Sequence, residues 1–178
     1  LPFIISGEIP NVFNALFETI SGYTTTGATI LSDVESLSKC LLFWRSFTHW
    51  IGGMGVLVFM LSILPLAGGN NMHILRAESP GPSVGKLVPR LRSTAKILYA
   101  IYAALTFIEF VLLLLGGMSL FDAVTTAFAT AGTGGFGIKN SSMAEYSVYI
   151  QNVVAIFMVL FGVNFAIYFL FLIKKPKE

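Results

Sequence analysis

The sequence predicts an all-α membrane protein built from helix–loop–helix repeats of the pore-loop type. The 178-residue chain is 55% hydrophobic, only 11% charged and has a mean hydropathy of +0.79, whereas a soluble domain carries about 25% charged residues. Three apolar segments are long enough to cross a bilayer. A short glycine-containing pattern also occurs twice, each time after a shorter helical segment.

The three long segments cover residues 41–66, 94–115 and 148–173. A spanning helix needs about 20 apolar residues, and each segment reaches that length. Two shorter segments, residues 11–23 and 119–131, precede the first and third spans. About a dozen residues are too few to span a bilayer, so we expect re-entrant helices there.

Both short segments carry a helix start signal. Asn11, which follows Pro10, is a good N-cap residue, and Ser119 forms a capping-box pattern with Asp122. The two units superpose without gaps at an offset of 108 residues, as the pair Asn11 and Ser119 illustrates. The sequence therefore predicts two similar units, each with a short helix followed by a loop.

The two loops are rich in threonine and glycine. The first contains Thr25, Thr26, Gly27 and Ala28, and the second contains Thr133, Gly134, Gly135 and Phe136. The second loop reads Thr-x-Gly-aromatic-Gly, like the Thr-Val-Gly-Tyr-Gly filter of potassium channels. Backbone carbonyls can replace the hydration shell of a cation without a formal charge that would trap it. Glycine reaches the backbone angles that aim successive carbonyls at one axis.

We therefore expect these eight loop residues to form a selectivity filter. Potassium would bind at Gly27 and Gly135, with Thr25 and Thr133 adding carbonyl and hydroxyl oxygens. The short helices would point their partly negative C-terminal ends toward the ion, which favours a cation. An ordinary loop between helices is the simpler interpretation of one such pattern, but the duplicated context favours the filter.

Basic residues gather on one side of the predicted membrane. The polar stretch 68–93, its edge and the C-terminal tail hold eight of the 11 basic residues: Arg76, Lys86, Arg90, Arg92, Lys96, Lys174, Lys175 and Lys177. The positive-inside rule places the linker and the tail in the cytoplasm and both loops outside. The net charge of only +2 gives no reason to expect nucleic-acid binding, and the single Cys40 excludes an internal disulfide framework.

Other functions find less support in the sequence. Residues 132–137 match the Gly-x-Gly-x-x-Gly dinucleotide pattern, but that pattern must follow a strand and open a helix, and here it follows a helical segment. The nine acids and two histidines are scattered and form no convergent catalytic cluster in the sequence, so we do not expect an enzyme. A non-conducting membrane scaffold in a transport complex would use the same helices and stays open as the alternative.

Four longer stretches resemble one known family. They are FETISGYTTTGAT (17–29), FWRSFTHWIGGMG (43–55), RAESPGP (76–82) and GGMSLFD (116–122). They closely resemble the membrane subunit of the Trk potassium-uptake systems, in the Trk/Ktr/HKT superfamily, and the likeness covers nearly the whole chain. The resemblance implies four helix–pore-helix–helix repeats around one pore in a single polypeptide.

Two of the four repeats correspond to this chain. Residues 1–67 match the second repeat, largely without its first helix, residues 68–93 match a cytoplasmic linker, and residues 94–178 match a complete third repeat. The first and fourth repeats have no counterpart here, so we expect the chain to be a fragment of a longer protein.

The resemblance also implies how such a protein works. It implies potassium uptake across the bacterial inner membrane, with potassium as substrate and no covalently bound cofactor. It implies a homodimer and a cytoplasmic, nucleotide-binding regulatory subunit. The family's gate, a break in the second helix of the third repeat, maps near Gly162 and Asn164. Close helix packing at a small residue is the alternative for Gly162.

Several further residues invite an interpretation. We expect Arg45 to snorkel or to pair with a carboxylate and His49 to be a hydrogen-bonded packing residue. Glu18 could pair with a base behind the filter or add negative potential to it. Glu109 lies inside the second span and should face protein or water, with a proton relay as the minority view. Residues 52–55 are expected to form a close-packing surface.

Overall fold

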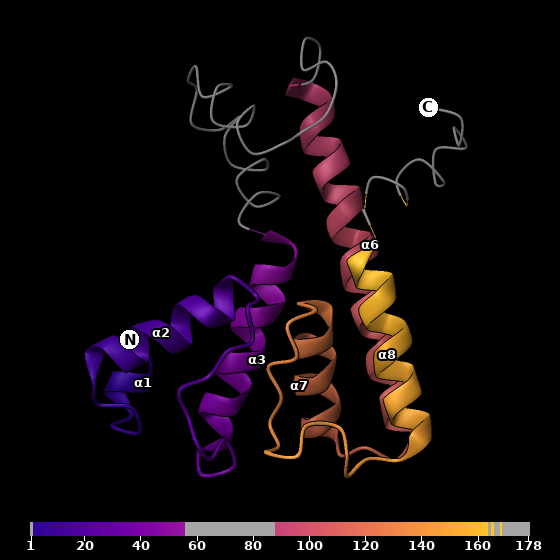
Figure 1. Ribbon diagram of the computed structural model, residues 1–178. Coiled ribbons are helices and arrows are strands. Elements are labelled where there is room, and N and C mark those ends of the chain that lie inside the picture. The colour runs from indigo at the N-terminus through magenta and orange to yellow at the C-terminus, as the bar shows by residue number, and fades with distance from the viewer. Residues whose placement is uncertain (1, 56–87, 164, 166–167, 169–178) are drawn as a thin grey trace.

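The computed structural model describes residues 2–55, 88–163, 165 and 168 (Figure 1). In this part of the chain every regular element is a helix, without any strand. The helices are α1 (Pro2–Ile5), α2 (Val12–Tyr23), α3 (Lys39–Gly53), α6 (Val88–Leu115), α7 (Leu120–Ala131) and α8 (Val148–Gly162). The described residues thus confirm the predicted all-α class.

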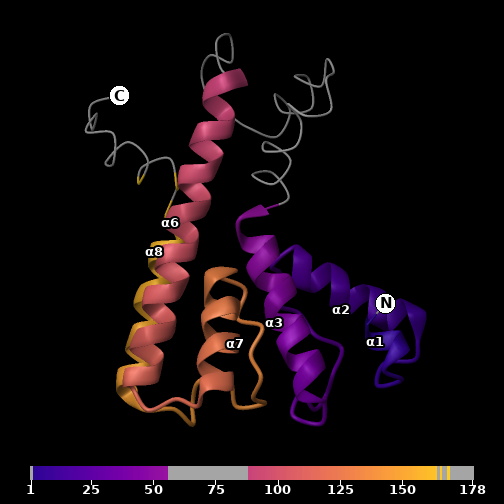
Figure 2. The same cartoon turned by 180° about the vertical axis from the view of Figure 1, so that it is seen from behind.

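Helix α3 lies between the two short helices of the fold. It packs against α2 on one side and against α7 on the other (Figure 1). Helix α7 packs in turn against α6 and α8, which run side by side, as Figure 2 shows from behind. This order places both short helices, and the loops that follow them, around α3.

The short helices begin where their caps predict. The side chain of Asn11 accepts hydrogen bonds from the backbone N–H groups of Phe13 and Asn14, at 2.9 and 3.3 Å. Ser119 accepts one from the N–H of Asp122 at 3.1 Å. Each cap satisfies N–H groups that have no partner inside the helix. Both helices have 12 residues, and α7 starts 108 positions after α2, at residue 120 against residue 12.

A second correspondence joins the helices that follow the loops. Helices α3 and α8 each have 15 residues and each follow a serine N-cap, Ser38 and Ser147. Their starts, residues 39 and 148, are 109 positions apart, so the second connector is one residue longer than the first. The repeat therefore extends beyond the loops into the helix that follows.

Helix α6 starts earlier than the sequence predicts. The second span was expected from residue 94, but the helix begins at Val88, within the stretch assigned to the linker. Pro89 fits the first turn of a helix, where its missing N–H costs nothing, and its arginine and leucine neighbours are good helix formers. The polar residues therefore extend the helix rather than end it.

One described helix is long and apolar enough to cross a membrane. It is the part of α6 from Lys96 to Leu115, 20 residues with a mean hydropathy of 2.3. The predicted spans 41–66 and 148–173 are helical over the portions in α3 and α8. Residues 56–66, most of the positions after 163, and the linker up to residue 87 lie outside the described residues.

Two apolar cores hold the helices together. One lies among α6, α7 and α8 and includes Leu113, Ala123, Ala127 and Phe157. The other joins α1, α2 and the first connector to α3 and includes Phe3, Ala15, Leu37 and Leu41. Large apolar side chains also lie exposed on the outer faces, among them Phe13, Phe107, Leu120 and Val159. So many exposed apolar groups are typical of a surface that contacts lipid or further protein.

Candidate functional site

The two loops share one backbone conformation. Thr25 and Thr133 both have φ = 54°, and Gly27 and Gly135 have φ = 74° and 71°. A positive φ is uncommon for a residue with a Cβ and is especially so for a β-branched one. The same unusual angles at corresponding positions mean that the repeat holds at the level of the backbone and not only of the sequence.

The loops also touch each other. A Cβ at Gly27 would collide with the carbonyl oxygen of Gly134, and a Cβ at Gly134 would collide with the carbonyl oxygen of Thr25 and with Nε2 of His49. Glycine at these two positions therefore permits the close approach. A Cβ at Gly135 would meet no described atom within 4 Å, so the positive φ is what favours glycine there.

Hydrogen bonds to the preceding helix hold the first loop. The N–H of Thr25 donates to the carbonyl of Gly22 at 3.1 Å, and that of Thr26 donates to the carbonyl of Ser21 at 3.0 Å. The hydroxyl of Ser21 donates to the carbonyl oxygen of Ala28 at 2.5 Å. The Ala28 carbonyl is therefore directed toward α2.

The second loop is fixed differently. The N–H of Thr133 donates to the carbonyl of Thr130 at 2.8 Å, and the N–H of Gly137 donates to that of Gly135 at 2.7 Å. The second bond closes a tight turn around Phe136, whose side chain is only 2% exposed. The aromatic ring of the Gly-Phe-Gly sequence thus packs inside the protein.

Several loop carbonyls accept no hydrogen bond from the described residues. They are those of Thr25, Thr26, Gly27, Thr133, Gly134 and Phe136. The Gly135 oxygen accepts one bond and keeps a second lone pair. An unpaired backbone carbonyl is a ligand of the kind that a potassium filter uses.

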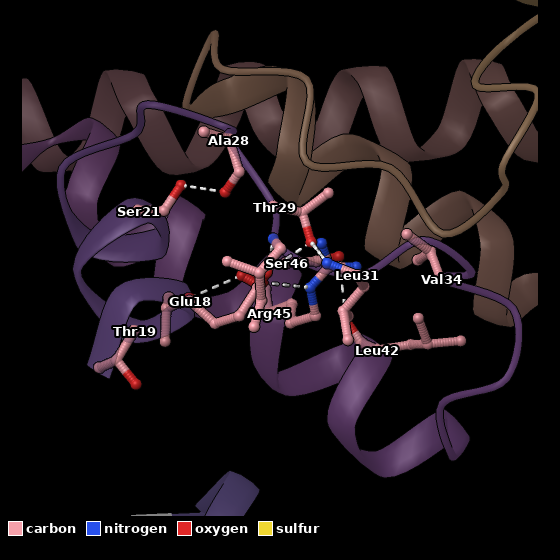
Figure 3. Close-up of polar contacts among 12 residues, drawn as sticks. Glu18, Thr19, Ser21, Ala28, Thr29, Leu31, Val34, Leu42, Arg45 and Ser46 are labelled. Atoms are coloured by element: carbon pink, nitrogen blue, oxygen red, sulfur yellow. Dashed lines mark hydrogen bonds and ion pairs between the residues drawn. The ribbon is translucent and has the colours of Figure 1, made fainter. Parts of the chain in front are cut away.

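A buried ion pair lies behind the first loop (Figure 3). Nε of Arg45, on α3, lies 3.3 Å from Oε2 of Glu18, on α2, and both side chains are almost completely buried. Oε1 of Glu18 accepts hydrogen bonds from the Thr29 hydroxyl at 2.5 Å and from the N–H of Ile30 at 2.8 Å. The expected pairing of Arg45 with a carboxylate, and of Glu18 with a base, is confirmed.

Arg45 also reaches the second loop. Its guanidinium carbon lies 3.9 Å from the ring centroid of Phe136, and Nη1 donates to the carbonyl oxygen of Gly137 at 3.4 Å. Local sequence patterns missed this contact, because its two sides come from different repeats. The Phe of the Gly-Phe-Gly sequence was the only available signal.

His49 fills the space under the second loop. It is fully buried, its ring lies 5.0 Å from that of Phe136, and a Cβ at Gly132 would press on it at 2.5 Å. The packing role is confirmed. The expected hydrogen bond is not found, since neither ring nitrogen has a partner among the described residues.

Other predicted residues are also located. Glu109 on α6 is fully buried and faces protein, and its carboxylate makes no hydrogen bond within the described ranges. Gly52 and Gly53 are closely packed, since a Cβ would meet the backbone of Tyr23 in one case and that of Ala131, at 2.9 Å, in the other. The close-packing interpretation is confirmed for these two glycines.

The predicted gate falls at the end of α8. Gly162 is its last residue, and Val163 follows with an extended backbone, φ = −70° and ψ = 141°. A Cβ at Gly162 would meet none of the described atoms within 4 Å, so close packing has no support there. Asn164 lies outside the described residues, and gating stays a prediction.

Asn140 links the connectors that follow the two loops. Its Oδ1 accepts from the N–H of Val34 at 2.8 Å, and its Nδ2 donates to Asp33 at 2.7 Å. Its own N–H donates to Glu35 at 3.1 Å. No local sequence pattern singles out this residue, which lies in a polar connector.

Comparisons with known proteins agree with this arrangement. A family model described as TrkH, cation transport protein, matches residues 1–178. The chain is 43% identical over 173 residues to the Trk system potassium uptake protein TrkH of Escherichia coli K12, covering 95% of this chain and 36% of that protein. It is 38% identical over 177 residues to TrkG of the same strain, covering 98% of this chain and 36% of TrkG.

The solved structures include a matching fold. The crystal structure of the potassium transporter TrkH from Vibrio parahaemolyticus matches with a TM-score of 0.69 and 36% identity, covering 89% of this chain and 31% of that one. The chain thus spans about a third of the length of the relatives that it matches. These relatives are transporters and not enzymes, and the chain belongs to the TrkH family of cation transport proteins.

Proposed function

We propose that this chain forms part of a potassium-uptake protein of the bacterial inner membrane, in which the two glycine loops supply part of a selectivity filter. One observation carries the proposal: two loops with the same backbone angles touch each other and present carbonyl oxygens that accept no hydrogen bond from the described residues. Relatives named as potassium uptake proteins support the choice of ion.

The ligands in this proposal are backbone oxygens. Thr25, Thr26 and Gly27 supply them from the first loop, and Thr133, Gly134 and Gly135 supply them from the second. The Phe136 carbonyl, which accepts no hydrogen bond from the described residues, belongs to this set as well, whereas the Ala28 carbonyl, bound by Ser21, supports the first loop instead. Such dipoles offset the dehydration of the ion and still let it leave, because they add no formal charge.

The helix arrangement supports a filter of pore-loop type. Helices α2 and α7 end immediately before their loops, so the partly negative helix ends lie beside the proposed ligands. Two loops cannot surround an ion as four would, so the remaining ligands come from repeats outside this chain. The gate below the filter lies in this account at the end of α8, near Gly162 and Asn164.

Two assembly features complete the proposal. The full-length protein forms a homodimer in the lipid bilayer, and a cytoplasmic subunit that binds a nucleotide regulates it. Both follow from the family resemblance of the motifs. Co-purification of the full-length protein with such a subunit, and its mass in detergent, would test them.

Substitution of Gly135 by Ser in the full-length protein tests the filter. The change strains a positive-φ position inside the proposed ligand set, so potassium uptake should fall and sodium should compete better. Gly117→Ser is the matched control, because Gly117 has φ = 88° and open space but lies between α6 and α7. Unchanged uptake and selectivity in Gly135→Ser would favour the non-conducting scaffold.

A further inference from the structure

We propose that Arg45 is a positioning residue that fixes the two glycine loops relative to each other and thereby sets the ion selectivity of the filter. The inference rests on the proposed function, since it assumes that the loops bind the ion. Beyond the backbone ligands of the proposed filter, the inference assigns a role to one side chain, Arg45, whose contacts join both loops.

Arg45 stands between the two repeats. It lies on α3, which packs against both α2 and α7. Toward the first loop it acts through Glu18, whose carboxylate accepts from Thr29 and Ile30. Toward the second loop it acts directly, by stacking on Phe136 and donating to Gly137.

The two anchored positions correspond. Thr29 and Gly137 are 108 residues apart, the same offset that relates Gly27 to Gly135. Each follows its filter glycine by two residues. The ion pair therefore holds the two loops at equivalent points, immediately after the carbonyls that are proposed to bind the ion. A shift of Arg45 would move one loop against the other.

The fold of a repeat does not require this ion pair. In the second repeat the positions that correspond to Glu18 and Arg45 are Thr126 and Val154, by the offsets of 108 and 109. Both line a cavity of about 220 Å³ that also borders Gly135 and Gly137. Helices α7 and α8 pack against each other all the same.

A buried ion pair is an expensive way to stabilise a fold. Removing two charges from water is costly, and apolar replacements of a buried ion pair are often neutral or stabilising. Since the second repeat manages without the pair, its presence in the first indicates a role in arranging the loops. The geometry also needs arginine, whose planar guanidinium can stack on a ring and donate from its edge at once, which a lysine ammonium does not.

Two variants of the full-length protein test this role. Arg45→Lys keeps the charge and loses the planar stack. The double variant Glu18→Thr with Arg45→Val copies the second repeat into the first, so a folded helix pair is expected. Lys39→Gln is the matched control: Lys39 is an exposed cation on the same helix, its Nζ lies 5.7 Å from the ring centroid of Phe121 on α7, and it carries neither the ion pair with Glu18 nor the contact with Phe136.

The readout is the ratio of potassium to sodium transport, measured on protein whose membrane insertion has been checked. We expect both Arg45 variants to insert and their ratio to fall by about tenfold or more, because small misplacements of preorganised groups have large effects. The Lys39→Gln ratio should not change. An unchanged ratio in both inserted Arg45 variants would overturn the proposal, as would loss of insertion in both, which would make the pair purely structural.

The two proposals fail in different ways. If Gly135→Ser leaves selectivity intact, the filter itself is wrong. If Gly135→Ser alters selectivity and the Arg45 variants do not, the filter stands and only the positioning role of Arg45 is wrong.

Discussion

Gly27 lies directly against the carbonyl oxygen of Gly134, so the two loops are in contact at the positions proposed to bind the ion. The contact joins residues from two different repeats. It depends on the missing side chain of Gly27, since any Cβ there would overlap the backbone of the other loop. The loops therefore behave as one unit, and a change in either should alter both.

This contact predicts unequal effects of alanine at the two filter glycines. Both Gly27→Ala and Gly135→Ala strain a positive-φ position, at roughly 1–2 kcal/mol. Only Gly27→Ala also forces the loops apart, because Gly135 has open space around it. Potassium uptake by the full-length protein should therefore fall further in Gly27→Ala. Equal potassium uptake in the two variants would show that the contact between the loops does not affect transport.

The side-chain caps of α2 and α7 predict that their removal lowers the stability of these helices. Asn11→Ala and Ser119→Ala each remove a cap that accepts backbone hydrogen bonds, so each should destabilise its helix by roughly 0.5–2 kcal/mol. Ser38→Ala is the control, since Ser38 precedes α3 without a side-chain cap bond. Thermal unfolding in detergent measures all three. A larger loss in Ser38→Ala than in the other two would contradict the assigned caps.

The link between the connectors predicts a dependence on pH. The hydrogen bond from Asn140 lowers the pKa of the exposed Asp33 carboxylate below its ordinary range. A carboxylate whose pKa is lowered in the folded state contributes stability above its unfolded pKa and loses it as the pH falls through the folded pKa. The link should therefore hold at neutral pH and weaken below about pH 4.

Asn140→Ala removes this link and should flatten that pH dependence. Thermal unfolding of the full-length protein between neutral and acidic pH would show it, with the difference between wild type and variant shrinking as the pH falls. The Asp33 pKa, followed by NMR, should rise in the variant. An unchanged Asp33 pKa would contradict the assigned contact.

The buried Glu109 predicts opposite outcomes for two substitutions. Glu109→Gln keeps the shape and removes the possibility of a buried charge, so insertion and uptake should be retained. Glu109→Lys places a cation in the same site and should prevent correct insertion. Uptake and surface expression measure both. Loss of uptake in a correctly inserted Glu109→Gln would instead support the proton-relay interpretation.

Local signals in the sequence predicted part of this structure. Asn11 and Ser119 start α2 and α7 because an N-cap depends only on neighbouring residues. The end of α6 at Leu115 agrees with the prediction because two glycines follow it. The apolar part of α6, Lys96–Leu115, agrees with the predicted span 94–115. The helix itself begins earlier, at Val88, because charged residues are compatible with a helix.

Local sequence signals do not predict the contacts between residues of different repeats. The pairing of Arg45 with a carboxylate was expected, but its stack on Phe136 joins residues from separate repeats, and no local pattern encodes that pairing. The bridge made by Asn140 was missed for the same reason. The filter residues themselves were predicted from a motif, and their role in binding an ion stays a prediction.

The central claim is that backbone carbonyls of both loops bind the transported ion. Crystals of the full-length protein soaked with Rb⁺, a close substitute for K⁺, test it through the anomalous scattering of rubidium. We expect a peak within coordination distance of carbonyl oxygens from both loops, at Thr25 to Gly27 and at Thr133 to Gly135. Rubidium bound elsewhere in the protein, with no peak beside either loop, would contradict it.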